Sequence, residues 1–148
     1  MKKITKSDSQ TRAFGREVAG RILKDRKQRA FVLCLEGDLG GGKTTFTQGL
    51  AKGLGIRGKI LSPTFVIMKS FAIPERVSKK FRKLFHLDCY RIRKEKEILE
   101  LGFKKIASDQ GNIIVIEWSE RIKKILPRER MILKFNFIDK NKREIIFK

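Results

Sequence analysis

The segment Gly37-Asp-Leu-Gly-Gly-Gly-Lys43-Thr44 decides the fold that this sequence predicts. It fits the pattern G-x-x-x-x-G-K-[ST] at every fixed position. The apolar run at residues 30–35 (AFVLCL) precedes it and is typical of a strand covered on both faces. Residues 44–54 follow with apolar side chains at helical spacing. Strand, glycine loop and helix in this order are the context in which the pattern cradles phosphate.

The residue types in this loop suit a nucleotide. Glycines let several backbone N–H groups turn inward around a phosphate, and the first turn of the following helix adds its free N–H groups and its positive dipole end. Lys43 supplies a charge for the β- and γ-phosphates, and the Thr44 hydroxyl is a ligand for Mg²⁺. The expected nucleotide-binding residues of this segment are Gly37, Asp38, Gly40, Gly41, Gly42, Lys43, Thr44 and Thr45.

Two acidic residues follow apolar runs elsewhere in the chain. Asp88 ends the run LFHL and Glu117 ends the run IIVI, so both are expected at strand ends. A phosphate loop needs a carboxylate there to hold the magnesium shell. Chain order does not say which of the two serves, and either could instead cap the next element. His86 lies one strand period before Asp88, on the same face, and a structural role is favoured for it.

The sequence also bears on which nucleotide base is bound, because it lacks an element that guanine-binding proteins carry. Proteins that bind GTP carry an N-K-x-D element after a buried strand, and the nearest match here is Asn141-Lys-Arg-Glu144. It ends in glutamate and falls in an expected hairpin turn. ATP is therefore the expected nucleotide.

The remaining patterns predict an α/β fold with a single P-loop NTPase-like domain over residues 1–148. The central sheet should be mixed and mostly parallel, flanked by helices, and should end in an antiparallel hairpin. Helices are expected at residues 9–26, 44–54, 94–101 and 119–126, and strands at residues 30–35, 65–73, 83–89 and 113–116 and in the hairpin that turns at residues 139–142.

Composition limits the location and the partners. The 36 Lys and Arg against 16 Asp and Glu give a net charge of +20, which favours anionic partners or reflects a lysine-rich surface. The longest apolar run has six residues, far below the ~20 of a membrane helix, so a cytoplasmic protein without membrane contact is expected. Cys34 and Cys89 fit no metal spacing and are expected in the core.

Several stretches together resemble one family. GDLGGGKTTF at 37–46, SPTF at 62–65, HLDCYR at 86–91, ILELGF at 98–103 and IEWSER at 116–121 have the order and spacing of TsaE proteins. This resemblance implies an ATPase that needs Mg²⁺ and takes part in forming threonylcarbamoyladenosine in bacterial tRNA. It also implies TsaB and TsaD as partners, and hydrolysis that depends on them.

The resemblance also implies roles for individual residues. Ser62, Pro63 and Thr64 resemble a switch-type loop near the γ-phosphate. Asp88 resembles the acid needed for hydrolysis, and Glu117, with Trp118 beside it, the magnesium-associated acid. Ser9, Thr11 and Arg143 resemble residues near the base; as alternatives they are a helix cap, a helix surface residue and a solvated turn charge.

Two other functions stay open at this point. A small-molecule P-loop kinase is one, although the chain offers little length for a lid and an acceptor domain. A basic RNA-binding module with a vestigial loop is the other, although no RNP-like pattern is present. The basic segment 74–83 (PERVSKKFRK) is longer than the family leads us to expect, and contact with tRNA, directly or through the partner proteins, is the hypothesis it raises.

Overall fold

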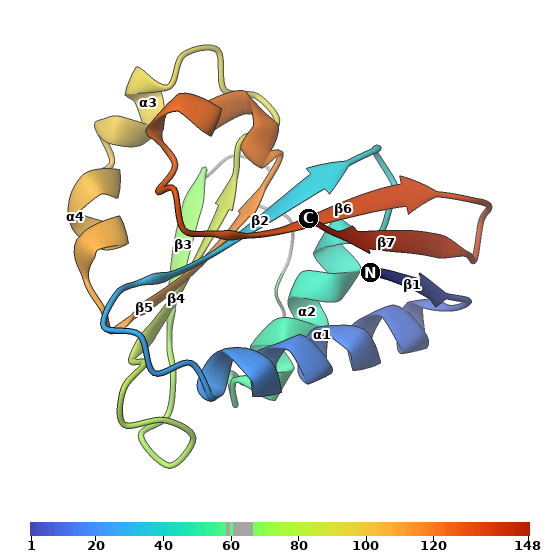
Figure 1. The fold of residues 1–148 in the computed structure, drawn as a ribbon, viewed down its shortest axis with the longest axis horizontal. Coiled ribbons are helices and arrows are strands. Elements are labelled where there is room, and N and C mark those ends of the chain that lie inside the picture. Colours follow the sequence, from blue (N-terminus) through green and yellow to red (C-terminus); the bar gives the residue numbers. More distant parts are fainter. Residues whose placement is uncertain (59, 61–66) are drawn as a thin grey trace.

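A computed structural model describes residues 1–58, 60 and 67–148 of the chain. Seven strands join one sheet in the order β1-β7-β6-β2-β5-β4-β3 (Figure 1). The first part of the strand expected at residues 65–73 falls outside the described residues. The strands are β1 (Lys2–Thr5), β2 (Phe31–Gly37), β3 (Met68–Ala72), β4 (Lys83–Asp88), β5 (Asn112–Glu117), β6 (Met131–Phe137) and β7 (Arg143–Phe147).

The sheet is mixed, as the sequence predicts. Its four central strands, β6, β2, β5 and β4, run parallel to one another. Antiparallel strands flank them, β3 on one edge and β7 followed by β1 on the other. Because the central strands are parallel, the carboxyl ends of β2, β5 and β4 meet at one edge of the sheet, and the acids expected there come together.

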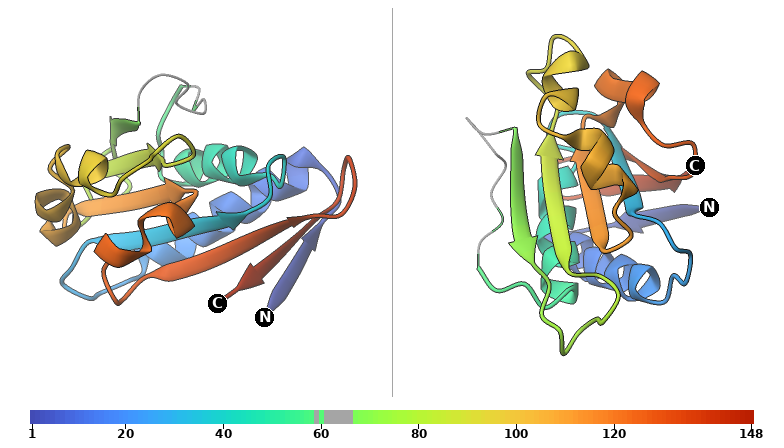
Figure 2. Two further views of the ribbon diagram at one scale, coloured as in Figure 1. Left: turned by 90° about the horizontal axis from the view of Figure 1, so that it is seen from above. Right: turned by 90° about the vertical axis from the view of Figure 1, so that its left-hand side faces the viewer.

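Helices cover both faces of the sheet (Figure 2). The long helices α1 (Asp8–Leu23) and α2 (Lys43–Gly53) pack against each other on one face. The short helices α3 (Lys96–Leu99) and α4 (Phe103–Ser108) and the 3₁₀ helix η1 (Ser119–Ile125) lie on the other. Ser7 caps α1, because its hydroxyl accepts a hydrogen bond from the backbone N–H of Gln10 at 3.1 Å.

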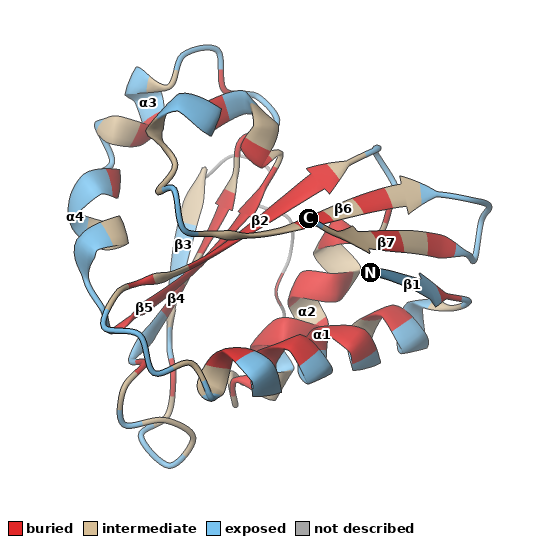
Figure 3. Ribbon diagram, in the orientation of Figure 1, coloured by how far each residue is buried: buried red, intermediate tan, exposed pale blue. Residues whose placement is uncertain are grey.

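Successive side chains of the buried strands point to opposite faces of the sheet, so the hydrophobic core has two parts. Leu33 and Leu35 of β2 face α1 and α2, whereas Val32 and Cys34 face the short helices. Figure 3 shows β2 and β5 buried along almost their whole length and the outward surfaces of the helices exposed. A strand covered on both faces needs a continuous apolar run, which is why the segment 30–35 was readable as a central strand.

Three elements differ from the expectation. β1 pairs with β7 through its backbone while three of its four side chains are exposed, so it has no apolar pattern to read. Residues 94–101 hold a helix of only four residues, α3. A further helix, α4, begins after Gly102, whose φ of 85° turns the chain where the sequence predicted only a stop.

Both thiols are buried, as expected of core cysteines. Burial raises the pKa of Cys34 to about 11 and that of Cys89 to about 12, so both stay protonated at neutral pH. In the part of the chain that the structure describes, no helix is both long and apolar enough to cross a membrane.

Candidate nucleotide-binding site

The glycine loop leaves β2 and enters α2, and two of its bends require glycine. Gly37 has a φ of 121°, and a Cβ atom there would collide with the backbone carbonyl of Phe135 on β6. Gly42 begins α2 with a φ of 97° and lies against the Arg143 side chain. Residues with a side chain rarely adopt these φ values, so glycine is needed at both bends. Because glycine has no side chain, the backbone N–H groups of the loop stay accessible to a phosphate.

Lys43 is held inside the loop and is only 5% exposed. Its ammonium group donates hydrogen bonds to the carbonyl oxygens of Gly37, at 2.7 Å, and Asp38, at 2.9 Å. The same nitrogen lies 4.1 Å from the centre of the Trp118 ring. Burial lowers the pKa of Lys43, and the nearby Glu117 carboxylate opposes that shift.

Glu117 joins the glycine loop to β4. The Thr44 hydroxyl donates a hydrogen bond to Oε1 of Glu117 at 3.0 Å. His86 lies 2.6 Å from the other carboxylate oxygen through Nε2, and Nε2 is the donor because a carboxylate only accepts. His86 is fully buried and Glu117 is 3% exposed, so their orientation is fixed by packing.

Asp88 lies beside Glu117. The two acids are register partners on the adjacent strands β4 and β5. One oxygen of Asp88 accepts a hydrogen bond from the backbone N–H of Tyr90 at 3.0 Å. Asp88 is less buried than Glu117, and it faces the pocket rather than the Thr44 hydroxyl. Both acids thus lie at the same edge of the sheet, and of the two it is Glu117 that accepts the hydrogen bond of the Thr44 hydroxyl.

A pocket of about 330 Å³ opens over these groups. Its lining includes the loop residues from Gly40 to Thr45 and the two acids, whereas the expected residues Gly37 and Asp38 lie outside it and hold Lys43 through their carbonyl oxygens. Asp8, Leu39 and Tyr90 also line the pocket, and sequence reasoning missed them as site residues. Tyr90 stands within HLDCYR and could have been noticed there, whereas only the packing of α1 brings Asp8 near. The lining residues are Asp8, Leu39, Gly40, Gly41, Gly42, Lys43, Thr44, Thr45, Asp88, Tyr90, Glu117, Trp118 and Arg143.

Trp118 has an unusual backbone conformation. Its φ is 59°, in the left-handed region that a bulky residue rarely occupies. The ring packs on Tyr90, with centroids 5.0 Å apart, and beneath the Lys43 ammonium. Strain of this kind gathers at functional sites, and here it turns the chain sharply after Glu117 so that the ring closes one wall of the pocket.

Of the three residues expected near the base, only Arg143 lines the pocket. Arg143 lines the pocket, and its Nη1 also donates to backbone carbonyls of the β6–β7 turn. Ser9 is exposed on the first turn of α1, and Thr11 is buried with its hydroxyl 2.7 Å from that of Thr5. Neither of these two lines the pocket. The expectations for Ser62, Pro63 and Thr64 lie outside the described residues.

The polar groups at this edge fit a nucleotide and Mg²⁺. Among the described residues no three His, Cys, Asp or Glu side chains gather as a metal site. Mg²⁺ does not need one, because it is usually held by one or two protein oxygens together with phosphates and water. The oxygens of Thr44 and Glu117 could supply such a partial shell beside the glycine loop. The fold and the site together define a P-loop nucleotide-binding protein.

Comparison with known proteins agrees. The family described as "Threonylcarbamoyl adenosine biosynthesis protein TsaE" matches residues 5–145. TsaE of Bacillus subtilis is 41% identical over 116 residues, which are 78% of this chain and 68% of that protein. TsaE of Treponema pallidum is 32% identical over 98% of both chains. The crystal structure of Bacillus subtilis YdiB superposes with a TM-score of 0.75 at 33% identity, covering 99% of this chain and 83% of that one.

This chain belongs to the TsaE family. The resemblance carried by the five sequence stretches is thereby confirmed, and so is the α/β class with its P-loop NTPase-like fold.

Proposed function

We propose that this protein is a Mg²⁺-dependent ATPase that acts in the formation of threonylcarbamoyladenosine in tRNA, together with TsaB and TsaD. The named role of its relatives supports the pathway. The observation that carries the enzymatic part is the hydrogen bond from Thr44 to Glu117 at the mouth of the glycine loop. Because tRNA is modified where tRNA is used, we expect the protein to act in the cytoplasm.

The chain's own residues would share the work. The N–H groups of the glycine loop and the Lys43 ammonium would hold the phosphates, for which Lys43 must exchange its bonds to the carbonyls of Gly37 and Asp38. Thr44 and Glu117 would hold Mg²⁺, which neutralises charge that develops on the phosphates. His86 would act as a positioning residue, because its hydrogen bond fixes the Glu117 carboxylate.

Asp88 suits a different task. It lines the pocket beside Glu117, and one of its carboxylate oxygens accepts the hydrogen bond of the Tyr90 backbone N–H. An acid in that place can orient an attacking water molecule, as hydrolysis requires. Adenine would lie toward Asp8 and Arg143, which line the pocket as an ion pair with their charged atoms 4.0 Å apart.

The test is ATP turnover by the purified protein, alone and with TsaB and TsaD, with and without Mg²⁺. We expect release of ADP and phosphate that needs Mg²⁺ and rises when both partners are present. Lys43→Ala is the matched inactive control. Turnover that requires a small-molecule phosphoryl acceptor would instead identify a kinase, and no turnover in any combination would contradict the proposal.

A further inference from the structure

A second cleft lies at the opposite end of the sheet from the glycine loop. Its volume is about 680 Å³, and it opens beside Phe31 and Met131, where β2 and β6 begin. The glycine loop follows the other end of β2, about 20 Å away at the usual rise of a strand. The cleft therefore belongs to a separate surface of the molecule.

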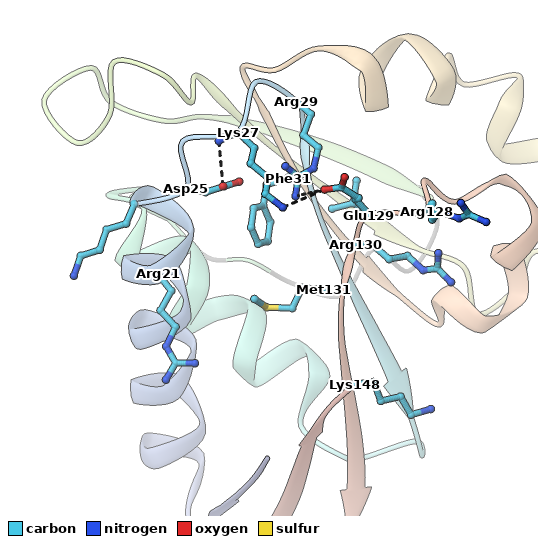
Figure 4. A pocket seen from close by; sticks show the side chains of 12 residues that line it. Arg21, Asp25, Lys27, Arg29, Phe31, Arg128, Glu129, Arg130, Met131 and Lys148 are labelled. Atoms are coloured by element: carbon cyan, nitrogen blue, oxygen red, sulfur yellow. Dashed lines mark hydrogen bonds and ion pairs between the residues drawn. The ribbon is translucent and has the colours of Figure 1, made fainter.

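Charge dominates the lining of this cleft. Seven Lys and Arg side chains line it, against only two acids, Asp25 and Glu129. The cations come from the end of α1, the loop that follows it, the residues before β6 and the end of the chain, and they surround the cleft (Figure 4). Segments far apart in the sequence thus build one concentrated positive field.

Ion pairs hold some of these cations but not all. Arg21 pairs with Glu17 at 3.1 Å, and Lys148 pairs with Glu36 at 3.3 Å. Glu129 is shared, because Lys27 lies 3.3 Å and Arg29 3.0 Å from the same carboxylate oxygen. Lys24 and Arg128 are exposed and have no ion pair or hydrogen bond through their side chains within the described residues. The Nε groups of Arg29 and Arg130 are buried without a partner in that same part of the chain. The ammonium of Lys24 and the guanidinium of Arg128 thus remain available for an anion, whereas the buried Nε groups of Arg29 and Arg130 are not accessible from solvent.

A neighbouring cleft extends the positive surface. Its volume is about 560 Å³, and Asp25 lines both clefts. Lys79 and Arg82, from the basic segment that the sequence singled out, are exposed on its rim. Lys80 differs from them, because its ammonium donates to the carbonyls of Asp25, at 2.8 Å, and Lys27, at 2.6 Å, and so holds the loop between the clefts. We call the surface over the two clefts the basic face.

We infer that the basic face binds the sugar-phosphate backbone of RNA. Its cations are spread over two open, adjoining clefts rather than converging on one buried point, which suits a chain of phosphates better than a single small anion. Four of those in the first cleft are arginines, whose planar guanidinium matches phosphate in two hydrogen bonds. The centre of a protein interface is depleted of charge, whereas charged side chains make up most of the lining of both clefts.

The choice of tRNA as the probe rests on the proposed function, whereas the basic face stands on its own geometry. The binding experiment uses nucleotide-free protein, and nucleotide affinity is measured separately. A failure of RNA binding therefore leaves the ATPase proposal intact, and a failure of ATP hydrolysis leaves the RNA measurement valid.

The experiment compares two triple variants of the full chain. Lys24→Gln, Lys27→Gln and Arg128→Gln remove three cations from the basic face. Arg93→Gln, Lys94→Gln and Lys104→Gln remove the same types from exposed positions just before α3 and in α4, outside both clefts; we call this the α3–α4 variant. An unmodified tRNA transcript is titrated into each protein at several salt concentrations. Each lost phosphate contact makes the slope of log K against log salt shallower by about one.

We expect the basic-face variant to bind tRNA more weakly and its salt slope to fall by about two to three, with the α3–α4 variant close to wild type. Both variants should bind ADP as wild type does, which shows that they are folded. Equal slopes for the two variants would overturn the inference and assign binding to net charge alone. Displacement of tRNA by polyglutamate as readily as by polyuridylate of equal charge would also overturn it, in favour of an acidic protein partner.

Discussion

The two ends of the parallel sheet use polar side chains in opposite ways. At the carboxyl end, Lys43, Glu117 and His86 are buried, and each has a fixed partner. At the amino end, cations such as Lys24 and Arg128 are exposed and are held by nothing that the structure describes. A buried polar group needs its partner, whereas an exposed charge acts through the summed field. Single substitutions should therefore act sharply at the first end and gradually at the second.

The sharpest expected effect comes from Lys43→Ala. The substitution removes a charge-assisted contact to phosphate of about 1.5–3 kcal/mol, which weakens nucleotide affinity by roughly 10- to 150-fold. We expect hydrolysis to be lost and the fold to be kept. Isothermal titration with ADP and a turnover assay measure this, and Lys52→Ala, on the exposed side of the same helix, is the control. Full turnover in folded Lys43→Ala would refute the glycine-loop assignment.

The next largest effect distinguishes the role of Glu117 from that of Asp88. Glu117→Gln keeps the size of the side chain but removes the charge beside Thr44, so nucleotide affinity should lose its dependence on Mg²⁺. Asp88→Asn should keep that dependence and mainly lower turnover. ADP and ATP binding with and without Mg²⁺ decides between them. The roles are reversed if Asp88→Asn loses the metal dependence and Glu117→Gln retains it.

The next smaller effect is the dependence of the free energy of unfolding on pH, which arises from titration of the buried thiols. The pKa of Cys89 is raised to about 12 in the folded protein from 9.0, so above pH 9 the unfolded chain loses its proton first. Stability therefore falls with rising pH, by about 1.4 kcal/mol per pH unit for one thiol, until the folded pKa is reached. The lowered pKa of Lys43 acts in the opposite direction. Urea unfolding from pH 8 to 10.5 should show a shallower decline in Cys89→Ala than in wild type.

The smallest expected effect concerns Lys80, the lysine of the basic face whose ammonium is held by backbone carbonyls. Lys80→Ala removes two hydrogen bonds to the loop between α1 and β2, so the free energy of unfolding should fall by about 1 kcal/mol. Lys79→Ala, one residue away and exposed, should change it by less than about 0.5 kcal/mol. Urea unfolding with unchanged m-values measures both. Equal losses would mean that Lys80 is as free as its neighbour.

Much of the fold was predictable because its signals are local. The buried strands β2 and β5 carry continuous apolar runs, and the hairpin of β6 and β7 carries alternation and a polar turn. β1 was missed because an edge strand is held by backbone hydrogen bonds that leave no side-chain pattern. Helix α4 was missed because six residues are too few for a helical period to stand out.

The sequence by itself determined the glycine loop, the kind of ligand that this loop suits and the two acids that end apolar strands. Glycines at fixed spacing, followed by lysine and threonine, specify their chemistry without regard to the rest of the chain. The TsaE family was readable for the same reason, since its short motifs are each contiguous.

Only the tertiary structure decided which acid meets Thr44. β5 is the direct neighbour of β2, whereas β4 lies one strand further away, so Glu117 reaches the loop and Asp88 remains beside it. The tertiary structure likewise brought Asp8 to the pocket and gathered the cations of the basic face from separate segments of the chain. Strand order and helix packing are contacts between distant parts of the chain, and no spacing along the sequence encodes them.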